Sequence, residues 1–322
     1  MRSSHPVCRE IEPDLLAVAA GEAGAAASER VKHHVASCAP CRAELGSYRA
    51  LDGLVRTLRS APLPGDDPTV ARAELESRLA DLRRRILGFG VFASPLGPIL
   101  IARSELGVSM VRYLEGRVGP TTAEVRRLLG EDAVEDRAAT EGLHRELLEY
   151  LEGWRTQLDW PLDLRAARSD FQRRVLTATA RLPYGAVTSY AGIARQIGAP
   201  QAARPVAQAL RWNPVPIAIP CHRVIGSGGG LTGYAGKKIG LKQRLLAIEG
   251  VRTEALRGDF RVPREAMYVR ALADTEYCLP TCGSLSRRPL AELTLFGSRE
   301  RAEAVGLSPC TTCRPDLHPL QR

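Results

Sequence analysis

Hydrophobic and polar positions along this chain predict helices first and a small sheet afterwards. Up to about residue 58 the apolar residues recur at three- and four-residue steps, the period of an amphipathic helix. Proline, glycine and aspartate interrupt the pattern at 60–68, which we interpret as a linker, and a charged amphipathic helix is expected over 69–87. Short β-type runs separated by turn residues then indicate a meander, at 91–93, 99–102 and 108–113. Two further helices are expected at 121–129 and 140–153.

The middle of the chain carries a helix-turn-helix-like pattern. Ser169 and Ser189 are suitable N-caps for two short helices, because their hydroxyls can accept hydrogen bonds from free backbone N–H groups. A third short helix is expected over 204–212. Two short helices joined by a tight turn in a basic protein are typical of DNA-binding folds. Nothing over 88–165 suggests a catalytic constellation, so we interpret that stretch as scaffold.

Composition places the chain among globular proteins. Its 322 residues are 44% hydrophobic and 25% charged, which excludes wholesale disorder, a collagen-like repeat and a coiled-coil rod. The most apolar run, 90–102, is broken by Ser94 and Pro95 and is shorter than the roughly 20 residues that span a bilayer. The first residues contain no apolar signal-peptide core. We therefore expect a cytoplasmic protein without a membrane partner.

The charge balance is basic. Lysine and arginine total 45 against 36 aspartates and glutamates, a formal charge of +9. Such a surface suits a polyanionic partner such as nucleic acid. The charge by itself is equally compatible with a basic protein that binds no polyanion.

The eight cysteines fall into three sets by spacing. In a reducing compartment, closely spaced cysteines indicate a metal site, whereas a lone cysteine indicates chemistry or an inert buried thiol. The sets are Cys8, Cys38 and Cys41; Cys221 alone; and Cys278, Cys282, Cys310 and Cys313.

Cys221 stands in a setting that favours a nucleophile. It follows an apolar run, 215–219, that we expect to be a buried strand, and it precedes His222 and Arg223. A thiolate forms readily only where a base or positive charge lowers its pKa. His222 supplies a base, and Arg223 with Lys237 and Lys238 supplies positive charge. Because adjacent residues on a strand point in opposite directions, a Cys–His contact requires a turn after Pro220 or a bridging water.

A catalytic histidine also needs an acceptor that orients its ring. The candidate is Glu249, at the end of a helix expected over 241–249. The helix dipole disfavours an anion at this end, and such local conflicts are expected at functional sites. The alternative is a solvated surface charge.

The stretch from Phe171 to Gly250 resembles the catalytic domain of the O6-alkylguanine-DNA alkyltransferases, and 88–164 looks like the N-terminal half of the same proteins. The resemblance rests on the following pieces, in order: Phe171-Gln172, Pro183-Tyr184-Gly185, Ser189-Tyr190, Ala202-Ala203-Arg204, Asn213-Pro214, IPCHRVIGSGG, Gly233-Tyr234 and LLAIEG.

The resemblance implies a stoichiometric repair reaction without a cofactor for alkyl transfer. Cys221 attacks the alkyl carbon on O6 of guanine in a flipped-out nucleotide and keeps the alkyl group, with O4 of thymine as a second expected target. His222 acts as base through a water and is held by Glu249. Tyr190 helps to eject the nucleotide and donates a proton toward the departing guanine. The partner is double-stranded DNA with an alkylated guanine, and flipping a base costs a few kcal/mol.

The same resemblance implies the DNA and substrate contacts. Arg204 fills the space that the ejected base leaves. Asn213 belongs to the catalytic set and frames the pocket with Tyr234 and Ala235. The expected DNA-contacting residues are Arg204, Tyr190, Arg223, Lys237 and Lys238.

Three positions depart from the family pattern. The chain has Arg204-Pro205-Val206-Ala207 where relatives commonly read Arg-Ala-Val-Gly, and Ala235 where relatives often carry serine. Proline is acceptable in the first turn of a helix, but Ala207 adds a side chain where glycine lets the backbone approach DNA. We expect a lower DNA affinity or a narrower alkyl range.

The C-terminal cysteines predict a zinc site. Four thiolates in two close pairs suit a closed tetrahedral zinc, which a domain this small needs for stability. Two disulfides are the alternative. The segment resembles the metal-binding domain of the bacterial Ada response protein, whose first cysteine, here Cys278, accepts methyl groups from DNA phosphotriesters. The alternative is a zinc module that accepts no methyl group and only stabilises the fold or docks DNA.

The N-terminal set predicts a second zinc site. His34 and Cys38 are four residues apart and share one helix face, with Cys41 and Cys8 nearby. The segment resembles zinc-binding anti-sigma domains, which implies a sigma factor as a partner. His5 and His33 are alternative ligands.

Together these observations predict an α+β multidomain monomer that repairs alkylated DNA. The alternative is a regulator that senses DNA damage or metal and acts through the N-terminal zinc domain without enzymatic activity. The expected parts are a zinc-binding helical domain (1–60), a linker and helix (61–87), a β-meander scaffold (88–165), a helix-turn-helix-like alkyltransferase domain (166–255) and a zinc-binding domain (256–322).

Overall fold

The computed structural model describes residues 6–60, 68–114, 120–130, 132–234, 238–256 and 259–320. Within these residues no helix is long and apolar enough to cross a membrane. The chain divides into two compact units, Met1–Arg78 and Leu79–Arg322. The finer domain boundaries expected from the sequence stay predictions. Two predicted site residues, Ala235 and Lys237, lie outside the described residues.

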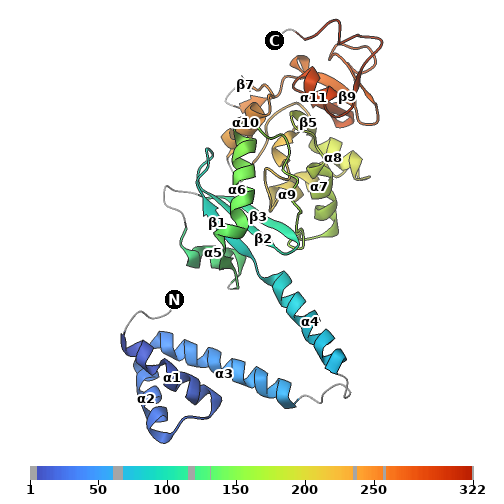
Figure 1. Cartoon of the computed structure of the whole chain (residues 1–322). Helices are drawn as coiled ribbons and strands as arrows, with labels where there is room; N and C mark the ends of the chain where they lie inside the picture. Colours follow the sequence, from blue (N-terminus) through green and yellow to red (C-terminus); the bar gives the residue numbers. More distant parts are fainter. Residues whose placement is uncertain are drawn as a thin grey trace. The chain divides into compact units, whose positions relative to one another are not determined.

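The first unit is helical, as the periodicity predicts. Three helices pack around one small core: α1 (Pro6–Ala20), α2 (Ala25–Ser37) and α3 (Ala39–Ser60) (Figure 1). Their buried side chains include Ile11, Leu15, Ala19, Val31, Cys41 and Leu45. The helix expected over 69–87 is α4 (Pro68–Arg85), which crosses the boundary between the two units.

The second unit begins with the predicted meander. Its sheet has the order β3-β2-β1-β4, with β1 (Gly88–Phe92), β2 (Ile99–Ser104), β3 (Gly107–Tyr113) and β4 (Val134–Glu135). β1, β2 and β3 are antiparallel neighbours, whereas β4 pairs in parallel with β1. Two helices follow the predictions, α5 (Thr122–Leu129) and α6 (Arg137–Leu151), and α6 packs on β1 and β2.

Four short helices form the middle of the described part of this unit. They are α7 (Asp170–Ala180), α8 (Tyr190–Gln196), α9 (Ala203–Arg211) and α10 (Ile239–Ile248). Among these described helices, only α7 and α8 carry a side-chain cap: the hydroxyl of Ser169 accepts from the backbone N–H of Gln172, and that of Ser189 accepts from the N–H of Gly192, as predicted for N-caps. α8 packs against α9 in the expected helix-turn-helix-like arrangement.

The strand expected over 215–219 does not form. Pro216 and Ile219 make only an isolated bridge, and Ile217 has a φ of 77°. Prolines at 214, 216 and 220 supply no backbone N–H for a ladder, so this apolar segment is buried as irregular turns. A 3-10 helix, η1 (Cys221–Arg223), and β6 (Val224–Ile225) follow directly.

Strands of the C-terminal segment extend the sheet that contains β5 and β6. This sheet has the order β6-β5-β11-β9, in which β5 (Ala186–Ser189) pairs in parallel with β6 and antiparallel with β11 (Leu293–Phe296). The other elements of the segment are β7 (Glu254–Leu256), β8 (Asp259–Arg261), η2 (Arg264–Ala266), β9 (Tyr268–Ala271), β10 (Glu276–Tyr277), η3 (Leu290–Glu292), α11 (Arg299–Glu303) and β12 (Ser308–Pro309). β5 leads directly into α8, and η3 packs against α8, so the C-terminal segment supports the helix-turn-helix-like region.

Candidate active site and cysteine clusters

Cys221 is held by the side chain of Asn213. Cys221 is the first residue of η1, and it is 9% exposed. The Asn213 amide donates to Cys221 Sγ at 3.2 Å and to the Ile219 carbonyl at 2.8 Å, while its oxygen accepts from the Val215 N–H at 3.0 Å. These three bonds close the irregular loop and fix the sulfur relative to α9.

His222 and Glu249 form a fully buried pair. His222 Nε2 lies 2.5 Å from Glu249 Oε1, and both side chains are inaccessible to solvent. Burial excludes the alternative that Glu249 is a solvated surface charge. Within the described residues, His222 Nδ1 is buried and has no hydrogen-bond partner, and no hydrogen bond joins His222 to Cys221.

Three further groups bind the Glu249 carboxylate. Arg223 Nε donates to both oxygens, at 3.1 and 2.8 Å, the Gly185 N–H donates at 3.0 Å, and the Tyr150 hydroxyl donates to Oε1. Burial by itself raises the pKa of Glu249, but the interactions of the carboxylate with His222 and Arg223, including their hydrogen bonds, outweigh it and lower the pKa to about 2. Arg223 was expected to contact DNA; its side chain is buried and bound to Glu249 in this structure, so the contact stays a prediction that the burial does not favour.

Burial keeps both reactive groups neutral at rest. It lowers the pKa of His222, although the Glu249 charge opposes this, so the imidazole is neutral at neutral pH. It raises the pKa of the Cys221 thiol, although the Asn213 hydrogen bond and the charge of Lys242 oppose this. A thiol next to a neutral base is poised to lose its proton during a reaction rather than before it.

Lys242 belongs to the site although the sequence motifs did not single it out. This lysine of α10 is fully buried, and its Nζ donates to the carbonyls of Val224 at 2.5 Å and Thr232 at 3.2 Å. Burial lowers its pKa to about 8, with the Cys221 thiolate acting in the opposite direction. The signal was present, because Lys242 lies three residues before Leu245 on the buried face of the helix.

Tyrosines surround the thiol and the imidazole. The Tyr190 hydroxyl donates to the Thr232 carbonyl at 3.3 Å, and the Tyr234 hydroxyl lies 2.8 Å from that of Tyr113. Tyr234 also packs edge-on to His222, with ring centroids 6.3 Å apart. Tyr113 and Tyr150 come from the stretch interpreted as scaffold, and through these two side chains that stretch supports Tyr234 and Glu249.

The predicted DNA-contacting residues of α9 and α10 differ in exposure. Arg204 is exposed in the first turn of α9, followed by exposed Pro205 and half-buried Ala207. Lys238 is half-buried at the N-cap of α10.

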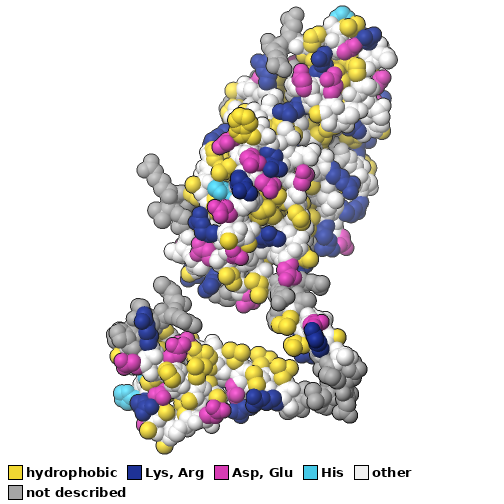
Figure 2. All heavy atoms as spheres, viewed as in Figure 1, with side chains coloured by type: hydrophobic (Ala, Val, Ile, Leu, Met, Phe, Trp, Pro, Cys, Tyr) yellow, Lys and Arg dark blue, Asp and Glu magenta, His cyan; other side chains and the backbone are white. Residues whose placement is uncertain are grey.

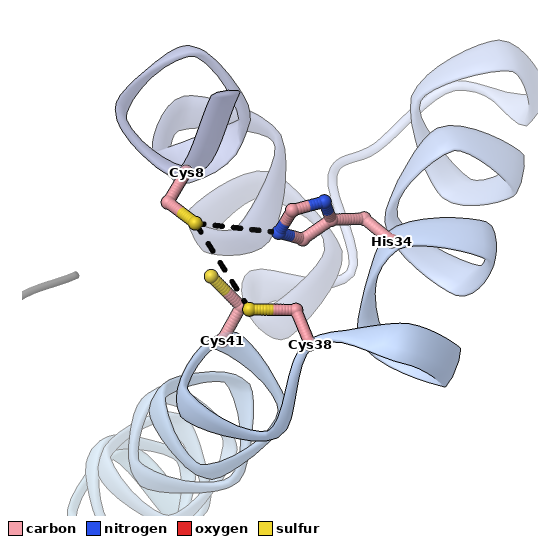
Figure 3. Close-up of side chains that lie close together, drawn as sticks. All are labelled: Cys8, His34, Cys38 and Cys41. Atoms are coloured by element: carbon pink, nitrogen blue, oxygen red, sulfur yellow. Dashed lines mark hydrogen bonds between the residues drawn. The ribbon is translucent and has the colours of Figure 1, made fainter. Parts of the chain in front are cut away.

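The N-terminal cluster brings together Cys8, His34, Cys38 and Cys41. One ligand atom from each lies within 4.8 Å of all the others. Cys8 Sγ is 3.8 Å from His34 Nε2 and 3.9 Å from Cys38 Sγ (Figure 3). A tetrahedron with zinc–sulfur bonds of about 2.3 Å has edges of roughly 3.8 Å, so this donor set fits zinc. His33 does not belong to the cluster, and His5 lies outside the described residues.

The C-terminal cluster brings together Cys278, Cys282, Cys310 and Cys313. Their sulfurs also lie within 4.8 Å of one another, and all but Cys313 are buried. The backbone N–H of Leu279 donates to Cys313 Sγ at 3.3 Å. All four are free cysteines, so the structure does not form the two disulfides considered as an alternative.

Three protein-family descriptions match this chain. "6-O-methylguanine DNA methyltransferase, DNA binding domain" matches residues 170–251, and "6-O-methylguanine DNA methyltransferase, ribonuclease-like domain" matches residues 87–164. A "putative zinc-finger" matches residues 8–42 and so includes the whole N-terminal cluster.

Individual relatives match about half of this chain. The methylated-DNA–protein-cysteine methyltransferase of Mycobacterium tuberculosis is 41% identical over 162 residues, which are 50% of this chain and 92% of that protein. The Methanosarcina acetivorans protein of the same name is 36% identical over 163 residues, 50% of this chain and 97% of that one. A crystal structure of the M. tuberculosis protein in complex with DNA is 40% identical over 50% of this chain and 92% of that chain, with a TM-score of 0.43.

Proposed function

The chain belongs to the O6-methylguanine-DNA methyltransferase family and is a methylated-DNA–protein-cysteine methyltransferase, and from this premise we propose that Cys221 is the residue that accepts the alkyl group. One observation carries the assignment. Cys221 Sγ is held by Asn213 beside a buried His222–Glu249 pair whose free nitrogen, His222 Nδ1, has no partner among the described residues.

The proposed reaction is a direct displacement. His222 takes the thiol proton of Cys221 through a water molecule, while Glu249 holds the imidazole with Nε2 protonated. The sulfur then forms a bond to the alkyl carbon as the bond from that carbon to O6 of guanine breaks. The electron pair of that bond leaves with the guanine, which takes a proton from Tyr190. The chain ends as a thioether and the DNA as guanine, so each chain reacts once.

We propose double-stranded DNA with an alkylated guanine as the partner. A base inside the stack is unreachable, so the nucleotide has to be flipped out at a cost of a few kcal/mol. We propose that Arg204, which is exposed on α9, fills the gap and that Tyr234 and Asn213 frame the pocket. Thymine alkylated at O4, a monomeric state and a cytoplasmic location remain predictions from the sequence.

The test is methyl transfer from duplex DNA with one O6-methylguanine, followed by peptide mass mapping. We expect one methyl group on the Cys221 peptide and none in C221A. C41S is the matched control, because it removes a thiol of the first unit. Binding of the lesion without an adduct would overturn the assignment and favour a damage sensor.

Both cysteine clusters fit zinc, and we propose that each holds one structural ion. The thiolate and imidazole donors are those that zinc prefers, and small modules with such sets depend on the metal for stability. We further propose Cys278 as a second methyl acceptor, by its likeness to the Ada metal-binding domain. The test uses DNA with a methyl phosphotriester as substrate. If the Cys278 peptide carries no methyl group afterwards, the proposal is refuted.

A second function is favoured by the first unit. Hydrophobic side chains gather on α3, where Leu51, Leu54 and Leu58 are 58%, 62% and 59% exposed (Figure 2). We propose that this face and the zinc module bind a sigma factor, as the anti-sigma resemblance implies. Purified sigma factors should bind the parent chain and bind L54D at least tenfold more weakly. Equal binding of both excludes this surface.

A further inference from the structure

A cavity of about 730 Å³ lies between the end of α10 and the C-terminal segment. The loop after α10 forms one wall, and β9, the residues around the start of α11 and the last described residues of the chain form the other. Cys221, Asn213 and Tyr234 do not line this cavity, so it is separate from the pocket of the alkyl group. Its volume is typical of a site for a small organic molecule.

Three arginines line the cavity: Arg252, Arg299 and Arg301. Among the described residues, no carboxylate pairs with Arg252 or Arg301, whereas Arg299 Nε lies 3.4 Å from Glu303 Oε1. The guanidinium carbon of Arg301 lies 4.4 Å from the ring centroid of Tyr184. Stacking on a ring does not use the N–H donors of a guanidinium, so Arg301 keeps them for an anion.

Two acidic residues also border the cavity, but the positive charge prevails. The Glu249 carboxylate is bound by His222 and Arg223, so its charge is already offset inside the active site. Glu300 is exposed, and water and salt screen an exposed charge. Three guanidinium groups are therefore opposed by a single solvated carboxylate among the described lining residues.

Tyr268 adds a neutral hydrogen-bond donor to this wall. The residue is 5% exposed, and its hydroxyl accepts from the backbone N–H of Leu320 at 3.2 Å. The described residues include no acceptor for the proton of this hydroxyl. Since buried hydroxyl groups normally donate as well as accept, this proton is available to a ligand. Pro319 and Leu320 make the neighbouring wall apolar.

We propose that this cavity binds the phosphate group of a small molecule, with Arg252, Arg299 and Arg301 around the phosphate oxygens and the Tyr268 hydroxyl donating to one of them. Guanidinium groups match phosphate oxygens in charge and in geometry. The phosphate is that of a free ion or of a small organic ester. The volume of the cavity and its apolar wall favour the ester.

The same contacts connect the cavity to the active site. The Gly297 N–H donates to the Gly185 carbonyl at 2.9 Å, and a Cβ atom on Gly297 would lie 2.6 Å from the Gly250 carbonyl oxygen. The Gly185 N–H in turn donates to the Glu249 carboxylate at 3.0 Å. A ligand that bridges both walls of the cavity therefore stabilises the docking of the C-terminal segment beside Glu249. Because such a ligand binds the folded chain, it raises the melting temperature.

The experiment measures binding to the full chain by calorimetry in a buffer without phosphate. The probes are inorganic phosphate and adenosine monophosphate, and thermal unfolding is followed with each. R252Q and R301Q are compared with the parent chain and with R301K. R287Q is the matched control, because Arg287 is an exposed arginine of the same segment that does not line the cavity.

We expect R252Q and R301Q each to lower the affinity about tenfold, the loss expected for one charge-assisted hydrogen bond. R301K keeps the charge and should retain most of the affinity, which separates charge from misfolding, and R287Q should bind like the parent. A probe at a hundredfold excess over its Kd should raise the melting temperature of the parent by about 5–10 °C. Tighter binding of adenosine monophosphate identifies an organic ester as the ligand, and equal affinities identify the phosphate group alone.

Equal affinities of the parent, R252Q and R301Q, or no binding of either probe at millimolar concentration, would overturn the proposal. So would displacement of adenosine monophosphate by unmodified duplex DNA, because the cavity would then be part of the DNA-binding surface. C221A should bind both probes like the parent. The site is therefore tested independently of methyl transfer, whose failure would refute the proposed function and leave this inference standing.

Discussion

At the scale of single residues, Lys242 changes the pKa of the Cys221 thiol through its charge. It does so without contacting the substrate. Its buried ammonium has a pKa lowered to about 8, so it is mostly charged at neutral pH and lowers the pKa of the thiol. In K242M this attraction is lost, and we expect the Cys221 pKa to rise and methyl transfer to slow by roughly tenfold for each unit of rise. The pH dependence of Cys221 alkylation by iodoacetamide measures this.

K32M is the control for Lys242, because Lys32 is an exposed lysine of the first unit. Its thiol pKa and rate should equal those of the parent. A thiol pKa unchanged in K242M, with a folded chain by circular dichroism, contradicts the electrostatic role and leaves Lys242 as a structural residue that binds two carbonyls.

His222 determines how methyl transfer depends on pH. Burial lowers its pKa below the usual 6.5, and only the neutral ring can accept the Cys221 proton. The rate constant should therefore be constant from about pH 6.5 to 8 and fall as pH drops through the lowered pKa. In E249Q the charge that raises this pKa is lost, so the acid limb should move to lower pH while the plateau falls at least tenfold. An acid limb that moves upward refutes this.

At the scale of elements, β11 is the part of the C-terminal segment on which the active site depends. Leu295 pairs in register with Val187 of β5, and both side chains are fully buried. L295A should lower the free energy of unfolding by about 2–5 kcal/mol. Because β5 leads into α8, the same loss of stability should lower the temperature at which methyl transfer is inactivated.

The control for L295A is L317A in the same segment, since Leu317 is 62% exposed. Its expected change is within about 0.5 kcal/mol. L295A could instead unfold the C-terminal segment in a separate transition and leave methyl transfer heat-stable. That result would refute the dependence of the active site on β11.

At the scale of the whole molecule, the two units predict separable functions. C41S removes one ligand from the N-terminal cluster, so bound zinc should fall by one ion per chain and helical content should decrease. Methyl transfer should stay within twofold of the parent, because the catalytic residues all belong to Leu79–Arg322. Atomic absorption and the Cys221 adduct assay measure both quantities.

C310S is the informative comparison for C41S. Its cluster shares a hydrophobic core with β5 and β11, so the loss of zinc should also lower the thermal stability of methyl transfer. A strong loss of activity in C41S would show that the two units depend on each other.

The sequence by itself determined the groups whose members are close along the chain. Cys221, His222 and the preceding proline, the close pairs within each cysteine cluster, the N-caps and the meander were all identified from local spacing, because periodicity and capping act within a few residues. Even the Glu249 hypothesis began from its place at a helix end.

Only the tertiary structure decided which distant groups complete the site. Tyr150 binds Glu249 across 99 residues, and Tyr113 reaches Tyr234 across 121. Arg223, expected at the DNA, is paired with the buried carboxylate of Glu249 instead, and β11 pairs with a strand about a hundred residues earlier. Packing brings such groups together, and the burial of apolar area that drives it has no direction. A local sequence pattern therefore does not predict which distant residue will pair with a buried carboxylate or which strand will pair with a sheet edge.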